Sequence, residues 1–268
     1  MTEIEGYVDS VLAVTSPILP LIHLLNRCMC FMEESTVETQ KCSDPREAFL
    51  ELLEEIRQEQ RQCVDKIGKV GSRLIARRDK VATFSTSGSV MEILKNAVRE
   101  GKEITAAAFE ARPNSEGYRT LQEISELGIP VTFGCDALLC KLVPGSKMFF
   151  IGADAISSTG EVYAKTGSYL AALVCSEFGI PFYVAADTSK FDPLSLLGFP
   201  IKDSLRPASE VTDMDIPEIS EVINISFELI PAKLVTGIIT EKGLISPHAV
   251  GLMMKPETMS SSMIHKLE

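Results

Sequence analysis

Residues 81–100 read VATFSTSGSVMEILKNAVRE, and the pattern of this stretch decides the fold. A β-rich run, Val81–Phe84, passes through a loop of serine, threonine and glycine into a helix-like segment near residues 90–100. Short runs of the same β-rich kind recur downstream, and they predict further strands. These runs lie at Ile104–Phe109, Pro130–Phe133, Met148–Ile151, Phe182–Ala186 and Val222–Phe227.

Helix-like segments separate these strands, near residues 117–127, 166–178 and 231–238. Strands that alternate with helices predict the α/β class, with a mostly parallel sheet covered by helices on both faces. In such sheets ligands bind beyond the carboxyl ends of the strands. Functional residues are therefore expected in the loops at residues 85–89, 110–117, 134–137, 152–165 and 186–191.

Residues 1–79 have a helical pattern instead. Asp44, Pro45 and Glu47 form a typical helix start with Asp44 as the N-cap. Apolar residues then recur at steps of three and four as far as Leu74, which predicts one long helix with candidate breaks at Gly68 and Gly71. Near the other end of the chain, residues 207–232 carry acidic and no basic side chains, and they predict an acidic connection before a last strand and helix.

Composition narrows the function. The chain of 268 residues has 26 basic and 37 acidic side chains, a formal net charge of −11, which argues against broad binding to nucleic acid or to an anionic membrane. The seven cysteines are odd in number, which favours reduced thiols and a cytoplasmic location. The acidic N-terminus is unlike a secretory signal, and prolines interrupt the apolar stretch Val11–Leu25, so no membrane span is expected.

Two of these loops, at residues 85–89 and 110–117, carry groups that can bind an anion. The first contains Ser85, Thr86, Ser87 and Gly88, where hydroxyls and backbone N–H groups at a helix N-terminus can cradle a phosphate or simply cap the helix. The second contains Arg112, whose planar guanidinium matches a phosphate, although a loop arginine is also often solvated or paired with a carboxylate.

Two further residues suit proton transfer and charge neutralisation. Asp154 follows the apolar strand Met148–Ile151, where a carboxylate is well placed for proton transfer or for capping the next turn. Lys165 stands at a helix start, where its charge opposes the helix dipole and a bound phosphate would relieve the conflict. Together with Arg112, these residues predict a pocket for a small phosphorylated ligand.

The sequence lacks the motifs of metal sites, nucleotide-binding loops and serine hydrolases. The three histidines and the cysteine pairs Cys28/Cys30 and Cys135/Cys140 match no metal-ligand spacing, so no metal is expected. The chain has no Walker loop, no dinucleotide fingerprint and no G-x-S-x-G elbow. The sequence therefore predicts neither a cofactor nor a Ser-His-Asp hydrolase.

A set of ordered motifs resembles the initiation factor 2B alpha/beta/delta family, which includes regulatory subunits of the translational exchange factor, methylthioribose-1-phosphate isomerase and archaeal ribose-1,5-bisphosphate isomerase. The resemblance runs from about Val81 to Val250 and looks strongest to archaeal members, including around Leu197-Gly198 and Arg206-Pro207. Its motifs are Glu110–Gly117, GIPVT at 128–132, CDA at 135–137, GAD at 152–154, KTG at 165–167, IPFYVAA at 180–186 and IITEKG at 238–243.

The resemblance implies a helical N-terminal domain at residues 1–79 and a Rossmann-like domain with the ligand pocket at residues 80–268. It also implies a homodimer or a higher homo-oligomer. In the isomerases of the family, the position of Ser85 is a catalytic cysteine and that of Asp154 is its acid/base partner, while Ala164 replaces the family's asparagine. An alcohol is far less acidic than a thiol and has to borrow a base.

These departures lead us to predict a factor-2B-like regulatory protein that binds a phosphorylated sugar or a nucleotide, with a translation initiation factor subunit as its protein partner. Thr86, Ser87, Gly88, Arg112 and Lys165 would hold the phosphate. The alternative is an aldose–ketose isomerase acting on ribose 1,5-bisphosphate or a related ribose 1-phosphate, with Asp154 and Ser85 as its catalytic residues. A third alternative is an oligomerisation subunit with a vestigial pocket.

Overall fold

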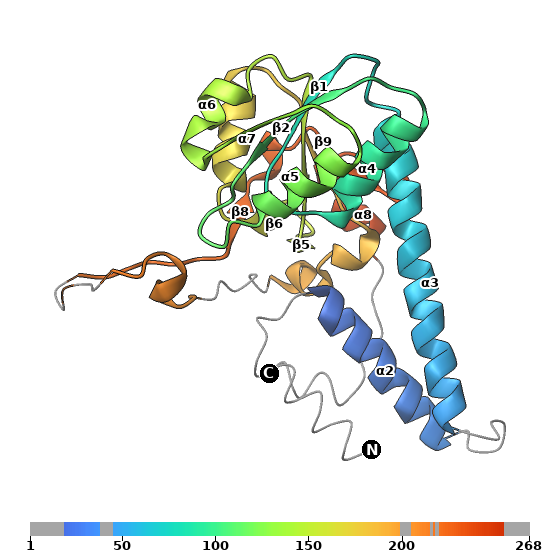
Figure 1. Cartoon of the computed structure of the whole chain (residues 1–268). Coiled ribbons are helices and arrows are strands. Elements are labelled where there is room, and N and C mark those ends of the chain that lie inside the picture. Colours follow the sequence, from blue (N-terminus) through green and yellow to red (C-terminus); the bar gives the residue numbers. More distant parts are fainter. Residues whose placement is uncertain (1–18, 38–44, 199–204, 215–216, 218–219, 255–268) are drawn as a thin grey trace. The chain divides into compact units, whose positions relative to one another are not determined.

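Seven strands form the central sheet of this computed structural model, in the order β10-β9-β7-β4-β1-β2-β3 (Figure 1). The structure describes residues 19–37, 45–198, 205–214, 217 and 220–254. Neighbouring strands from β9 to β3 are parallel, and β10 runs antiparallel to β9. The strands are β1 (Lys80–Thr83), β2 (Thr105–Phe109), β3 (Val131–Gly134), β4 (Met148–Gly152), β7 (Phe182–Ala185), β9 (Gly237–Thr240) and β10 (Gly243–Ile245).

A second, three-stranded antiparallel sheet has the order β5-β6-β8. Its strands are β5 (Ala155–Ile156), β6 (Val162–Lys165) and β8 (Phe227–Ile230). Only two residues separate the end of β4 from the start of β5, so the small sheet begins at the carboxyl edge of the central sheet.

Helices cover both faces of the central sheet. Adjacent phenylalanines of β4 show this, because successive strand side chains point to opposite faces. Phe149 packs in a cluster with residues of α6 and α7, whereas Phe150 packs in a cluster with residues of α4 and α5. The helices are α2 (Leu19–Val37), α3 (Pro45–Ser72), α4 (Gly88–Arg99), α5 (Gly117–Glu126), α6 (Leu139–Leu142), α7 (Ser168–Glu177) and α8 (Val250–Met253).

The predicted α/β class is confirmed, but the sequence placed two late elements wrongly. Residues 231–238 do not form a helix: a single 3-10 turn, η5 (Ala232–Leu234), leads into strand β9, because the β-branched run after Val235 pairs with β7 inside the sheet. The strand predicted at Val222–Phe227 begins only at Phe227, where its backbone pairs with Lys165 of β6.

The long predicted helix is confirmed as α3, which continues through Gly68 and Gly71 rather than breaking there. Packing explains both glycines, since a Cβ on Gly68 would lie 2.5 Å from Asn96 Nδ2 and one on Gly71 would lie 2.4 Å from Ile93 Cδ1. Both positions therefore let α4 approach α3 closely. The predicted cap, Asp44, and the first part of the stretch Val11–Leu25 lie outside the described residues.

Grouped by their contacts, the described residues up to Gln62 form one unit and residues 63–254 another, while the boundary at residues 79 and 80 stays a prediction. In the first unit α2 packs on α3 through Phe31 and Phe49, whose ring centroids lie 6.1 Å apart, and Arg27 pairs with Glu59 at 2.5 Å. Residues 63–254 contain both sheets and all the candidate residues.

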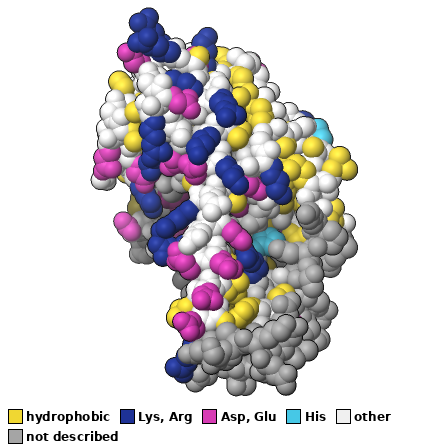
Figure 2. Space-filling view, turned by 90° about the vertical axis from the view of Figure 1, so that its right-hand side faces the viewer, with side chains coloured by type: hydrophobic (Ala, Val, Ile, Leu, Met, Phe, Trp, Pro, Cys, Tyr) yellow, Lys and Arg dark blue, Asp and Glu magenta, His cyan; other side chains and the backbone are white. Residues whose placement is uncertain are grey.

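Charged side chains of both signs lie among one another on the face shown in Figure 2. Arg77 with Glu103, Lys69 with Asp65 and Arg99 with Glu92 are ion pairs between 2.6 and 2.9 Å, and such exposed pairs contribute little to stability. In the described part of the chain, no helix is both long and apolar enough to cross a membrane, and no disulfide joins its cysteines.

Candidate functional site

Four neighbouring strands of the central sheet deliver polar side chains to one edge. In sheet order these strands are β7, β4, β1 and β2, and all four run parallel. The side chains that follow their carboxyl ends are Lys190, Asp154, Ser85 and Glu116, in the same order. Because β1 and β4 are neighbours, Ser85 and Asp154 follow adjacent strands, at the edge where ligands bind in such sheets.

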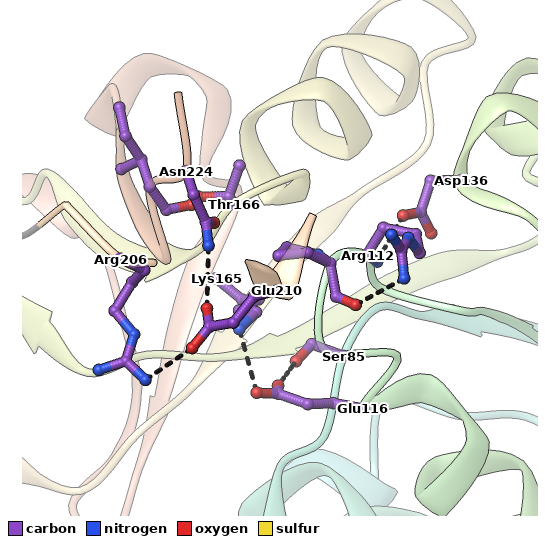
Figure 3. A network of polar contacts seen from close by, with 11 residues as sticks. Ser85, Arg112, Glu116, Asp136, Lys165, Thr166, Arg206, Glu210 and Asn224 are labelled. Carbon is purple, nitrogen blue, oxygen red and sulfur yellow. Dashed lines mark hydrogen bonds and ion pairs between the residues drawn. The ribbon is translucent and has the colours of Figure 1, made fainter. Parts of the chain in front are cut away.

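Ser85 and Lys165 both bind Glu116, a residue that was not among those predicted from the sequence. The Ser85 hydroxyl donates to Glu116 Oε2 at 2.6 Å, and Lys165 Nζ lies 3.0 Å from Glu116 Oε1 (Figure 3). Ser85 and Lys165 are both buried, with 7% of each residue exposed. The carboxylate therefore bridges a hydroxyl and an ammonium group, and it joins the central sheet to the small one.

The backbone holds this cluster in place. Ser85 has φ +60°, the left-handed region that a residue with a Cβ seldom adopts, and the Thr120 hydroxyl donates to its carbonyl oxygen at 2.7 Å. Next to Glu116, a Cβ on Gly117 would lie 1.7 Å from the Phe109 carbonyl oxygen, so only glycine allows the turn into α5. These local constraints direct Ser85 and Glu116 toward each other.

Asp154 is half-buried beside three charged residues. Loss of hydration raises its pKa, the negative charge of Glu116 raises it further, and the positive charges of Lys190 and Lys165 oppose the rise. The backbone N–H of Asp154 donates to the Tyr163 carbonyl at 2.9 Å, and the Lys190 ammonium donates to the Ala153 carbonyl. These surroundings thus make Asp154 a weaker acid than a carboxyl group in water.

The serine-rich loop forms the N-terminus of α4. Ser87 Oγ accepts from the Val90 N–H at 3.4 Å, so Ser87 serves as a helix cap, while Thr86 is half-buried and Gly88 is exposed. A Cβ on Gly152 would lie 2.6 Å from Ser87 Oγ, which brings the start of α4 against the end of β4. The helix therefore begins at the same edge of the sheet as Ser85 and Asp154.

Arg112 lies at the side of this cluster and bonds to backbone oxygens. Its guanidinium donates to the carbonyls of Pro113 and Val211, each at 2.8 Å, while its own N–H donates to Asp136 Oδ2 at 2.8 Å (Figure 3). Arg112 is exposed, and among the residues that the structure describes no carboxylate forms an ion pair with its guanidinium. It ties the loop after β2 to the segment of residues 205–214.

That segment contributes residues that the sequence analysis treated only as an acidic connection. Glu210 accepts from Arg206 at 2.8 Å and from the Asn224 amide at 2.9 Å, and these hydrogen bonds lower its pKa, helped by the positive charge of Lys165. Glu210 thus adds a second anion to the surroundings of Lys165. No three His, Cys, Asp or Glu residues of the described part lie together as a metal site would need.

Comparisons with known proteins agree with this architecture. The family model of the Initiation factor 2 subunit family matches residues 8–247, which confirms the resemblance seen in the motifs. The crystal structure of the Pyrococcus horikoshii translation initiation factor eIF-2B superposes with a TM-score of 0.67 at 26% sequence identity, covering 91% of this chain and 88% of that one.

Two curated relatives carry the names of sugar-phosphate isomerases. The ribose 1,5-bisphosphate isomerase of Methanocaldococcus jannaschii is 33% identical over 76% of this chain and 67% of its own length. The methylthioribose-1-phosphate isomerase of Maridesulfovibrio salexigens is 38% identical over 70% of this chain and 58% of its own length. The match thus spans between 58 and 67% of these relatives. Both names favour the isomerase alternative over the regulatory function that we predicted first.

Proposed function

Because the chain belongs to the Initiation factor 2 subunit family, we propose that its pocket binds a phosphorylated pentose and isomerises it from aldose to ketose. One observation carries this proposal most strongly. Asp154, a carboxyl group whose pKa burial raises, lies within the electrostatic influence of Lys190 and Lys165 at the edge of the sheet where ligands are expected. A neutral acid with cations beside it is what the opening of a phosphorylated sugar ring needs.

The substrate class follows from the relatives and from the charges of the pocket. Ribose 1,5-bisphosphate and methylthioribose 1-phosphate both place a phosphate on the anomeric carbon of a ribose. In our proposal the N-terminus of α4, with Thr86, Ser87 and Gly88, holds phosphate together with Lys165 and Arg112. Arg112 would exchange its bond to the Val211 carbonyl for one to the phosphate.

The role proposed for Asp154 is that of general acid. When the bond between the anomeric carbon and the ring oxygen breaks, the ring oxygen gains negative charge and takes a proton. A neutral carboxylic acid donates that proton, and positioned acids of this kind typically accelerate such steps by about 10² to 10⁴-fold.

A product assay on the wild-type protein with both substrates tests the proposal. Asp154→Asn keeps the size of the side chain and removes its acidity, so we expect turnover to fall about 100-fold or more with substrate affinity nearly unchanged. Asp65→Asn is the matched control, because Asp65 lies on α3 in an exposed ion pair with Lys69. Equal turnover in Asp154→Asn and wild type would contradict the acid role.

A second candidate is a protein that binds the same ligand without turning it over and acts through protein association. Ser85 favours this candidate, since a neutral hydroxyl stands where the resembling isomerases carry a cysteine. The two candidates differ in one result. If wild type binds ribose 1,5-bisphosphate without turnover and Ser85→Cys turns it over, the binding function is supported and the isomerase proposal is wrong.

A further inference from the structure

We propose that Glu116 is the general base of this site and that the Ser85 hydroxyl carries the proton to it. This inference rests on the proposed isomerase function and assigns a catalytic residue that neither the motifs nor the relatives named above supply. It starts from the hydrogen bond of 2.6 Å in which Ser85 Oγ donates to Glu116 Oε2.

The direction of that hydrogen bond matters. A serine hydroxyl that donates to a carboxylate has its oxygen lone pairs free to accept a second proton from a neighbouring hydroxyl. As it accepts one proton it can release its own to the carboxylate, so the pair acts as one base. This arrangement supplies what a lone serine lacks, since an alcohol does not titrate near neutral pH.

The two carboxyl groups of the pocket stand in different surroundings. Glu116 accepts from the Lys165 ammonium through Oε1 at 3.0 Å and from the Ser85 hydroxyl through Oε2 at 2.6 Å. Asp154 is held away from water and near the negative charge of Glu116, which favours the neutral acid. Two carboxyl groups in such different surroundings suit the separate roles of an acid and a base.

The reaction of a ribose 1-phosphate balances with Ser85, Glu116 and Asp154 as the groups that exchange protons with it. The C2 hydroxyl gives its proton to Ser85 Oγ while Ser85 gives its own proton to Glu116. The hydrogen on C2 moves to C1 with its electron pair, so C2 is oxidised to the ketone and C1 is reduced. The bond between C1 and the ring oxygen breaks, and the ring oxygen takes the proton of Asp154.

No outside oxidant or reductant enters this step, because the hydride stays within the sugar. One proton has moved from Asp154 to the ring oxygen, and one from the C2 hydroxyl to Glu116. Exchange with water after product release restores both groups. Lys165 keeps one of its three N–H groups on Glu116 Oε1 throughout, which leaves its other two for phosphate and Glu116 Oε2 to receive the proton.

The experiment measures turnover and binding of ribose 1,5-bisphosphate and of methylthioribose 1-phosphate in the full chain. Glu116→Gln removes the basic oxygen and keeps the shape, and Ser85→Ala removes the relay. We expect each single variant to lower kcat about 100-fold or more, with substrate affinity within about threefold of wild type. Because the two residues act as one unit, the double variant should lose no more than either single one.

Glu123→Gln is the matched control, since Glu123 lies on α5 in an ion pair with Arg119 and is expected to leave kcat unchanged. Wild-type turnover that survives Glu116→Gln, or losses that multiply in the double variant, would overturn the base role and leave the isomerase proposal standing. A wild-type protein that binds both sugars and turns over neither overturns the isomerase proposal, and the base role falls with it.

Discussion

The Ser85 hydroxyl donates to the Glu116 carboxylate across 2.6 Å and thereby joins the second residue after β1 to the residue before α5. The two positions are 31 residues apart in the chain, and their meeting depends on the pairing of β1 with β2. Asp154 and Lys190 reach the same edge from β4 and β7. The sheet order therefore assembles the site, and each side chain enters from a different loop.

Burial of Asp154 makes the stability of the protein depend on pH. Its pKa is raised above the ordinary value of 3.8, so at a pH between the two values the folded state keeps a proton that the unfolded chain has lost. As pH rises from that ordinary value through the raised one, stability falls. We expect Asp154→Asn to raise Tm at pH 8 and to have little effect at pH 4.

Calorimetric unfolding of both proteins at the two pH values measures this effect. Each kcal/mol gained corresponds to about 2–4 °C in Tm for a domain of this size. Asp65→Asn serves again as control, because Asp65 is exposed on α3. An equal difference between Asp154→Asn and wild type at both pH values would show that the charge of Asp154 is not the cause.

Because α3 and α4 approach closely, we expect a single methyl group added at Gly71 to lower the free energy of unfolding. A Cβ on Gly71 would lie 2.4 Å from Ile93 Cδ1 and 2.5 Å from Ile93 Cγ1, and Ile93 is fully buried. We expect Gly71→Ala to destabilise the protein by about 1–3 kcal/mol, as overpacking typically does. Gly88→Ala is the control for added volume, since nothing lies within 4 Å of a Cβ there. Denaturant unfolding compares the two variants.

The sequence predicted the parts of the fold that local patterns determine. The strands β1, β2, β3, β4 and β7 follow from short β-rich runs, and the loops after them contain Ser85 and Asp154. Strand β8 was placed too early because residues 222–226 are mostly apolar, whereas the structure uses the Asn224 side chain to bind the Pro207 carbonyl and Glu210. Pairing with β6 decides where that strand begins.

Glu116 and Lys190 could not be singled out from the sequence in the same way. Their roles depend on partners that are distant in the chain, Ser85 for one and the Ala153 carbonyl for the other. The sequence offers only a weaker indication, since each of the two residues lies in a loop that follows a predicted strand. A polar residue placed directly before a sterically required glycine, as Glu116 is before Gly117, is the more informative pattern.

An exposed apolar face on α7 predicts self-association. Leu170, Leu173 and Phe178, the last at the end of the helix, are each 45–50% exposed, although the opposite face of α7 is buried. Several large apolar side chains exposed along one short helix favour a protein interface. We expect a dimer at micromolar concentration by light scattering, and a monomer for Leu173→Glu. Leu50→Glu, at an exposed position on α3, should remain dimeric, and a wild-type monomer would contradict the prediction.

The guanidinium of Arg112 is bound by backbone carbonyls rather than by a carboxylate, and we expect it to bind phosphate instead when a sugar phosphate is present. A phosphate is a better partner than a carbonyl, since charge-assisted hydrogen bonds contribute about 1.5–3 kcal/mol. Removing the guanidinium should therefore weaken the binding of ribose 1,5-bisphosphate about tenfold or more, which calorimetric titration of Arg112→Ala measures. Arg119→Ala controls for the loss of one positive charge, because Arg119 lies exposed on α5 and pairs with Glu123. Unchanged affinity in Arg112→Ala would assign this arginine to holding residues 205–214 through Val211 and leave the phosphate to Lys165 and the start of α4.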